Sequence, residues 1–151
     1  FFNFSPAKIF MGDSGALTIG VILSVLSIKL IEFDRTELPP NLLQTSVPVF
    51  VMAALSYPLT DTLRVFVYRA IRGISPFAAD KNHIHHRLLE LGLSHGQTVL
   101  LIYLYTIGII CLSLSLNMDP SMQLIICATV AFLVPQLPVL LHYLKHRVKI
   151  K

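Results

Sequence analysis

The sequence is poor in charged residues. Only 13% of its 151 residues are Asp, Glu, Lys or Arg, against roughly 25% in an average soluble domain. This deficit excludes a disordered chain and a nucleic-acid-binding tail, and it argues against an ordinary soluble domain. The hydrophobic share of 54% and the mean hydropathy of +0.71 indicate a membrane protein instead.

Cysteine is scarce as well, and no signal peptide is visible. Cys111 and Cys127 each lie inside an apolar run, so we interpret both as small buried hydrophobic residues rather than as a disulfide or redox pair. The N-terminal stretch lacks the basic segment and the short apolar core of a secretory signal. Because the chain begins with Phe1 and with motif-like residues, we expect it to be the C-terminal part of a longer protein.

Long apolar runs are what the sequence does have. A membrane-spanning helix takes about 20 residues, and four segments approach or reach this length. We predict an all-α integral membrane protein with four transmembrane helices, at residues 16–33, 45–60, 98–116 and 121–144. Residues 1–151 then form the C-terminal part of one multi-span domain, with a histidine-rich cytoplasmic loop over 73–96.

Prolines interrupt two of these segments. The second segment is short and contains Pro48 and Pro58, so we expect one broken helix that continues as a polar helix over 61–72. The fourth segment contains Pro135 and Pro138, which predict a kink because proline removes a helical hydrogen bond.

Basic residues predict the orientation. If all four segments cross the membrane, only Lys29 and Arg35 fall toward one side. The basic residues of the other side are Lys8, Arg64, Arg69, Arg72, Lys81, Arg87, Lys145, Arg147, Lys149 and Lys151. This asymmetry is the positive-inside pattern, so we expect the N-terminal motif, the histidine loop and the C-terminal tail to be cytoplasmic.

A first polar cluster, Phe-Met-Gly-Asp-Ser-Gly, stands just before the first apolar segment at residues 10–15. Gly12 and Gly15 remove side chains on both sides of Asp13, so a phosphate or a metal ion could approach the backbone closely. One interpretation is an Asp or Ser N-cap on a membrane helix. The other is a Mg²⁺ ligand, since Mg²⁺ prefers one or two carboxylates together with substrate phosphates and water.

A second cluster follows Pro58. Asp61, Arg64, Tyr68 and Arg72 are spaced i, i+3, i+7 and i+11, which places them on one face of a helix. This basic stripe could hold an anionic substrate or a lipid headgroup. The alternative is an Asp61–Arg64 ion pair on an interfacial helix whose basic residues lie at the lipid phosphates.

The third cluster holds three histidines in four residues, His83, His85 and His86, followed by Arg87. Zinc sites on helices usually pair histidines at i, i+4 with a carboxylate, so this spacing favours zinc only weakly. A hydrogen-bond-rich cationic edge that grips a diphosphate fits better, because histidine and arginine donate to phosphoryl oxygens. A solvated polar loop is the remaining alternative.

Together the three clusters resemble the C-terminal part of the polyprenyl-phosphate N-acetylhexosamine-1-phosphate transferases of glycosyltransferase family 4. The bacterial undecaprenyl-phosphate GlcNAc-1-phosphate transferases are the most similar branch. The segments that carry the resemblance are residues 3–15, 58–65 and 75–88, in this order and with a span between the first two. The resemblance covers about two-thirds of the chain, since the last two helices match only as generic spans.

The resemblance implies a reaction and a set of site residues. A polyprenyl phosphate would attack the sugar-bearing phosphorus of a UDP-N-acetylhexosamine, releasing UMP, with Mg²⁺ (or Mn²⁺) bridging the diphosphate. Catalytic roles fall on Asp13, His83, His85 and His86, with Asp13 as the metal ligand. Substrate-binding roles fall on Asn3, Phe10, Arg64 and Arg87. Phe10 would stack on the uracil.

The resemblance also implies partners and a location. The partners are UDP-N-acetylhexosamine, undecaprenyl phosphate and membrane lipids, without nucleic acid, and a homodimer is left open. The location is the bacterial cytoplasmic membrane, with the active site facing the cytoplasm, at the first membrane step of a cell-envelope polysaccharide.

One departure limits the activity that we expect. The family's paired aspartates have no counterpart here, and Asp61 and Asp80 stand isolated in the sequence. We therefore expect the chain alone to be inactive. The rival to an enzyme is a non-enzymatic membrane module, either metal-binding through the histidine loop or purely structural.

Overall fold

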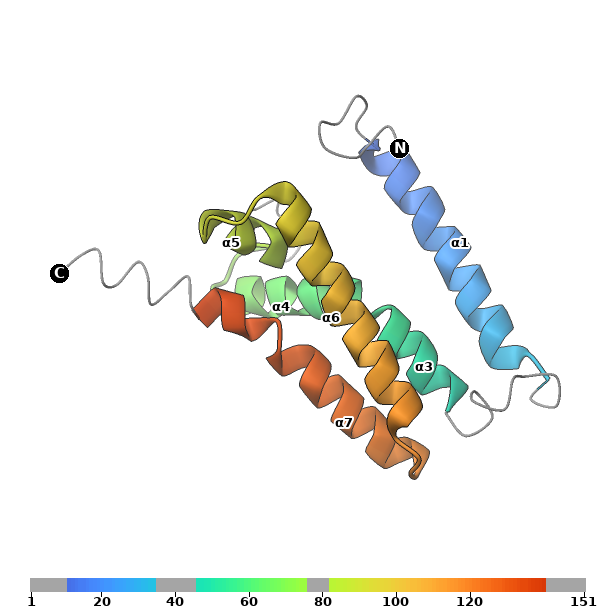
Figure 1. Cartoon of the computed structure of the whole chain (residues 1–151). Helices are drawn as coiled ribbons and strands as arrows, with labels where there is room; N and C mark the ends of the chain where they lie inside the picture. Colours follow the sequence, from blue (N-terminus) through green and yellow to red (C-terminus); the bar gives the residue numbers. More distant parts are fainter. Residues whose placement is uncertain (1–10, 35–45, 76–81, 141–151) are drawn as a thin grey trace.

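The described part of the chain is entirely helical in its regular structure (Figure 1). The computed structural model describes residues 11–34, 46–75 and 82–140. Its helices are α1 (Gly12–Glu32), α3 (Val47–Ala54), α4 (Ser56–Ile71), α5 (Ile84–Glu90), α6 (His95–Ser115) and α7 (Pro120–Leu133). Three helices are long and apolar enough to span a membrane: α1, α6 and the segment Pro120–Leu140. The predicted all-α membrane fold is confirmed.

The fourth possible span is a bent pair. Helices α3 and α4 meet at Leu55 with an angle of 69° between them. The predicted break is therefore present, but it precedes Pro58 by three residues. Pro58 lies instead in the first turn of α4, where backbone N–H groups have no helical acceptor and a missing one removes nothing.

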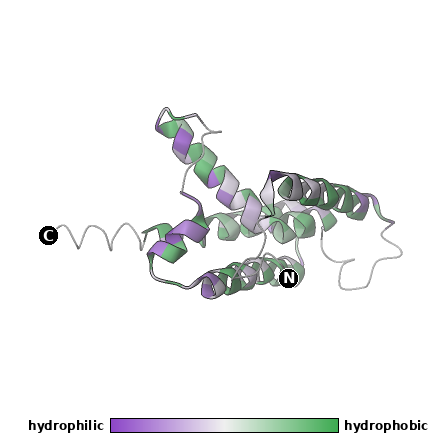
Figure 2. Ribbon diagram, turned by 90° about the horizontal axis from the view of Figure 1, so that it is seen from above, coloured by the Kyte–Doolittle hydropathy of each residue, from purple (hydrophilic) through white to green (hydrophobic). Residues whose placement is uncertain are grey.

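The two halves of this pair differ in polarity. Helix α3 is apolar throughout, whereas α4 carries Asp61, Arg64 and Arg69 among its hydrophobic residues. Figure 2 shows this contrast, with hydrophilic colour on α4 and α5 and largely hydrophobic colour along α1, α6 and α7. The bend thus directs the polar helix away from the axis of its apolar partner.

Helices α3, α6 and α7 form the packed core. Ala53, Ile109 and Ala131, one residue from each helix, are buried against one another. Small residues at such a contact let helix backbones approach closely, which is how helices gain packing energy in a membrane. Cys127 is buried near this contact and Cys111 is exposed, and both are free. The expectation that both cysteines are buried is therefore wrong for Cys111, which lies on the outer surface of α6.

Gln123 closes the hairpin between α6 and α7. Its side chain is 1% exposed, and Nε2 donates to the carbonyls of Ser113 (2.6 Å) and Leu116 (3.2 Å) at the end of α6. The backbone N–H of Ser46 donates to Oε1 at 3.3 Å, which ties in the start of α3. The final carbonyls of a helix have no intrahelical donor, so one buried amide satisfies groups from two other helices.

The predicted kink in the last segment is confirmed. Helix α7 ends at Leu133, a turn contains Val134 and Pro135, and the chain is helical again over 136–140. Helix α1 packs against α3 near its own C-terminal end, where Leu26 and Leu30 face Val51 and Leu55. None of the residues of α1 is buried.

Candidate functional site

A buried carboxylate joins α4 to the histidine segment. Asp61 is 5% exposed, and three donors surround it. His83 Nδ1 lies 2.9 Å from Oδ2, while the Ile84 N–H (3.0 Å) and Arg64 Nη2 (3.1 Å) donate to Oδ1. We call this arrangement the Asp61 junction. Asp61 looks isolated in the sequence, but in the fold it holds a segment that lies 22 residues further along the chain.

Arg64 is part of the same junction. Besides its ion pair with Asp61, Nη2 donates to the backbone carbonyl of Asn82. Only 10% of the Arg64 side chain is exposed. The Asp61–Arg64 ion pair, one of the two alternatives for this cluster, is thus observed. The assignment of Arg64 to substrate binding stays a prediction.

Helix α5 presents its histidines because its other face is buried. Ile84 and Leu88, spaced i, i+4, are each 3% exposed and pack beside Leu101 and Tyr105 of α6. His83 stands at the N-cap in an extended conformation. Gly92, with φ +104°, lies just beyond the C-cap Leu91, as expected for the residue that ends this helix.

The three imidazoles lie together on this helix. The rings of His83 and His85 are stacked with centroids 5.8 Å apart, and those of His85 and His86 are 4.2 Å apart. Burial lowers the pKa of His85 below its usual value, and the neighbouring His86 and His83 add to this effect. His85 therefore favours its neutral form, so the permanent positive charge of α5 comes from Arg87.

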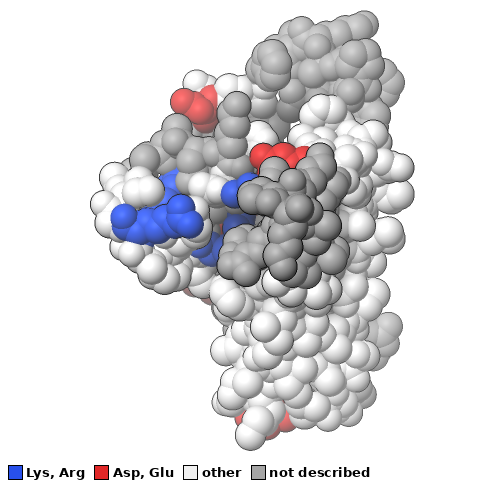
Figure 3. Space-filling model, turned by 90° about the vertical axis from the view of Figure 1, so that its left-hand side faces the viewer, with Lys and Arg blue, Asp and Glu red and all other residues white. Residues whose placement is uncertain are grey.

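Arg87 is oriented by two contacts on its own segment. Nη1 donates to Glu90 Oε2 at 3.0 Å, and Nη2 donates to Asn82 Oδ1. On α4, the Arg72 guanidinium lies over the Tyr68 ring at 4.4 Å, so these two stripe residues do share a face. Figure 3 views the left-hand side of Figure 1 and shows Lys and Arg side chains gathered in one area. An anionic ligand would meet a basic surface there.

Asp13 lies in the first turn of α1 and is exposed. Met11 occupies the N-cap, and no side chain caps this helix, so the capping interpretation of Asp13 or Ser14 is wrong. Gly12 has φ +65°, a conformation that glycine adopts without strain. Figure 1 places the N-terminal end of α1 and helix α5 at the same end of the long helices, with α1 standing to one side.

Metal-ligating groups are sparse in the described ranges. Within residues 11–34, 46–75 and 82–140, no three His, Cys, Asp or Glu side chains are grouped so that they could hold a metal ion. Asp13 could supply one carboxylate to a Mg²⁺ that takes its other ligands from phosphates and water. Asn3, Phe10 and Asp80 lie outside the described residues.

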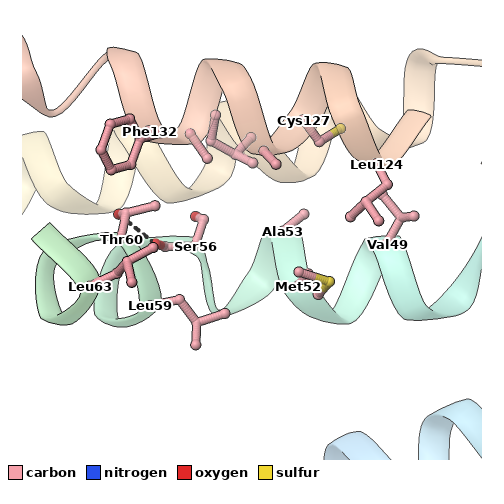
Figure 4. A pocket seen from close by; sticks show the side chains of 13 residues that line it. Val49, Met52, Ala53, Ser56, Leu59, Thr60, Leu63, Leu124, Cys127 and Phe132 are labelled. Carbon is pink, nitrogen blue, oxygen red and sulfur yellow. Dashed lines mark hydrogen bonds between the residues drawn. The ribbon is translucent and has the colours of Figure 1, made fainter. Parts of the chain in front are cut away.

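An apolar pocket of about 280 Å³ lies between the bent pair and the last two long helices. Figure 4 shows Ala53, Ser56 and Thr60 on one side of it and Leu124 and Phe132 on the other. Its lining is almost wholly hydrocarbon, so it suits an apolar chain rather than a nucleotide. No sequence motif marked the pocket, because its residues come from four helices and, apart from Ser56 and Thr60, share only their hydrophobicity.

The described structure is that of a multi-pass helical membrane protein with a polar, histidine-bearing segment at one end of its helices. Residues 1–31 match glycosyl transferase family 4. The chain is 38% identical over 146 residues to decaprenyl-phosphate N-acetylglucosaminephosphotransferase of Mycolicibacterium smegmatis, covering 91% of this chain and 36% of that protein. The chain is therefore similar to proteins of glycosyltransferase family 4.

Two other relatives show the same similarity. The probable undecaprenyl-phosphate N-acetylglucosaminyl 1-phosphate transferase of Bacillus subtilis is 42% identical over 104 residues, which is 69% of this chain and 27% of that protein. The undecaprenyl-phosphate alpha-N-acetylglucosaminyl 1-phosphate transferase of Haemophilus influenzae is 34% identical over 95 residues, which is 63% of this chain and 24% of that protein. The chain thus spans about a quarter to a third of the length of these relatives. No solved structure matches it.

Proposed function

We propose that this chain forms the C-terminal part of a transferase that moves GlcNAc-1-phosphate from UDP-GlcNAc to undecaprenyl phosphate, with release of UMP. The supporting observation is the Asp61 junction, which brings the Pro-Leu-Thr-Asp segment of α4 to the histidine segment. Both segments belong to the resemblance, and relatives named as GlcNAc-1-phosphate transferases match this chain. On this proposal the product begins a cell-envelope polysaccharide at the bacterial cytoplasmic membrane.

The proposed chemistry must bring together two anions that repel each other. Arg87 supplies a permanent positive charge and a forked donor beside the histidines. We assign it to the diphosphate, with His85 and His86 donating hydrogen bonds to the sugar and phosphoryl oxygens. Asn3 and Phe10 are assigned to the nucleotide through the resemblance, with Phe10 stacked on uracil.

Asp13 is assigned as a Mg²⁺ ligand. Its exposure and its place beside Gly12 at one end of the long helices fit a metal ion that is shared with a substrate diphosphate. When bound, Mg²⁺ (or Mn²⁺) would neutralise charge on the diphosphate and on departing UMP. A single carboxylate makes an incomplete site, so we assign the other protein ligands to the larger part of the transferase.

The polyprenyl chain needs an apolar channel that reaches the polar end of the helices. The pocket between α3, α4, α6 and α7 supplies an apolar surface of this kind, and it extends along α4 to Thr60 and Leu63. Asp61 lies between these two residues in the sequence, so the pocket lies close to the Asp61 junction. We propose that the lipid tail lies along this surface while its phosphate meets the cytoplasmic site.

The test is turnover by the complete transferase that contains this chain, purified in detergent. Labelled UDP-GlcNAc, undecaprenyl phosphate and Mg²⁺ should yield a lipid-linked sugar and UMP in equal amounts. Residues 1–151 alone should give no product. Saturable binding of Zn²⁺ or Ni²⁺ to the histidine segment, without any product from UDP-GlcNAc, would favour the metal-binding module instead.

A further inference from the structure

We propose that Asp61 is a positioning residue for His83, fixing which nitrogen of this histidine meets the substrates. The proposal rests on the transferase function above and assigns different roles to the two ring nitrogens of His83. His83 would act through Nε2, while Nδ1 stays committed to the protein.

The hydrogen bonds of the junction carry the argument. An ionised carboxylate only accepts hydrogen bonds, and both oxygens of Asp61 are engaged. Oδ1 accepts from the Ile84 N–H and from Arg64, which leaves Oδ2 to His83 Nδ1 at 2.9 Å. Nδ1 must therefore carry a proton, whatever the protonation state of Nε2.

The exposure of the two side chains indicates which nitrogen of His83 the protein holds and which one is free to meet substrates. The Asp61 side chain is 7% exposed, whereas that of His83 is 35% exposed. The ring is thus held along its inner edge, and its outer edge, with Nε2, is left for substrates. A neutral His83 then presents a lone pair at Nε2.

The same carboxylate fixes the position of the ring as well as its tautomer. By bonding the Ile84 N–H, Asp61 also holds the first residue of α5. Ring and helix start are therefore set by one anchor on α4, a helix already packed against α6 and α7. His85 and His86 have no such anchor among their contacts within the described residues, so the three histidines are not equivalent.

The direct test is the tautomer of His83 in the complete transferase. Protein labelled with ¹⁵N-histidine would be studied by NMR at a pH well above about 6.5, where imidazole is neutral. A His83→Gln variant identifies the signals of this residue. We expect a protonated Nδ1 and an unprotonated Nε2. The opposite tautomer in the unsubstituted protein would overturn the proposal, without need of any Asp61 variant.

The Asp61→Asn variant tests the function of this bond. Asn keeps the size but offers its amide N–H as a donor toward Nδ1, which favours the opposite tautomer. We expect kcat to fall by at least about tenfold, within the range for general acid–base groups, with little change in KM for UDP-GlcNAc. In a His83→Ala background the same substitution should cause no further loss.

A merely structural Asp61 would reduce activity equally in both backgrounds, and that result would overturn the proposal. The matched control is Asp119→Asn, since Asp119 also accepts from a backbone N–H, that of Ser121 at 3.0 Å, in the α6–α7 turn. It should keep activity within about twofold. If the unsubstituted enzyme has no transferase activity, the proposed function fails, while the NMR result still decides whether Asp61 sets the tautomer of His83.

Discussion

The hydroxyl of Tyr105 on α6 donates a hydrogen bond of 2.7 Å to the backbone carbonyl of Ala131 on α7. Ala131 stands four residues before Pro135, which has no N–H to offer that carbonyl. A side chain from the neighbouring helix thus satisfies the group that the proline leaves open. Gln136 Nε2, on the segment just after the kink, donates to the carbonyl of Phe132 at 3.1 Å. Pro135 therefore causes the kink after α7, and the hydrogen bond from Tyr105 on α6 stabilises it.

Substitution of Tyr105 by Phe should destabilise the protein without changing the shape of the core. It removes one hydrogen bond to a half-buried carbonyl in an apolar setting, for an expected loss of about 1 kcal/mol of unfolding free energy. Tm in detergent micelles measures the effect. Tyr103→Phe is the control, because the Tyr103 side chain is exposed. Equal shifts for both variants would contradict a stabilising role for the Tyr105 bond.

Substitution of Gln123 by Leu should be more damaging. It leaves the Ser113 and Leu116 carbonyls and the Ser46 N–H without their partner at a site that is 1% exposed. An orphaned buried group costs about 1–3 kcal/mol, so a loss of at least about 2 kcal/mol is expected in a micellar unfolding titration. Gln136→Leu, which removes a single hydrogen bond at a half-buried position, serves as the control. A loss no larger than that of the control would show that the hairpin does not depend on Gln123.

Local rules were sufficient for part of this fold. The length of the apolar runs predicted the long helices, and Pro135 predicted the kink. Both signals lie within a single segment of the sequence and need no knowledge of tertiary contacts. Pro58 correctly indicated a break but not its place, since a proline is accommodated inside the first turn of a helix. Cys111 was assigned to the core because its neighbours are apolar, a pattern that in a membrane protein also marks the outer surface.

The site shows a different limit. The Asp61–Arg64 pair follows from helical spacing, but the bond from Asp61 to His83 joins residues 22 positions apart. Nothing in the periodicity of either segment signals that contact. Asp61 after Pro58 and His83 in the histidine cluster were both visible in the sequence. Only the packing of Ile84 and Leu88 beside α6 brings them together.

The lowered pKa of His85 predicts a pH-dependent stability. Burial is the main cause, followed by His86 and His83, with Asp61 acting in the opposite direction. Unfolded His85 takes up its proton near pH 6.5, whereas folded His85 does so only at lower pH. Between the lowered pKa of folded His85 and pH 6.5, the unfolded chain binds more protons than the folded protein. The contribution of neutral His85 to stability is therefore present above pH 6.5 and is lost as the pH falls through this range.

The measurement is Tm between about pH 7.5 and about pH 5, which brackets histidine titration. The unsubstituted protein should lose more stability over this range than a His85→Gln variant, in which the remaining histidines still titrate. Identical losses in the two proteins would mean that His85 titrates alike in the folded and unfolded states. An ¹⁵N-histidine titration of the folded protein should place the midpoint for His85 below 6.5.

Removing the charge of Asp13 should weaken Mg²⁺ dependence in the complete transferase. In an Asp13→Asn variant the carboxylate assigned to the metal ion is lost, while the exposed start of α1 keeps its size and polarity. We expect turnover at fixed Mg²⁺ to fall by at least about tenfold, because the charge of the diphosphate is then less well neutralised. Raising Mg²⁺ should restore part of the loss, a response that a folding defect would not show. Glu32→Gln, the last residue of the same helix, provides the matched control and should leave the Mg²⁺ titration unchanged. Turnover and Mg²⁺ requirement equal to those of the unsubstituted enzyme would remove Asp13 from the metal site.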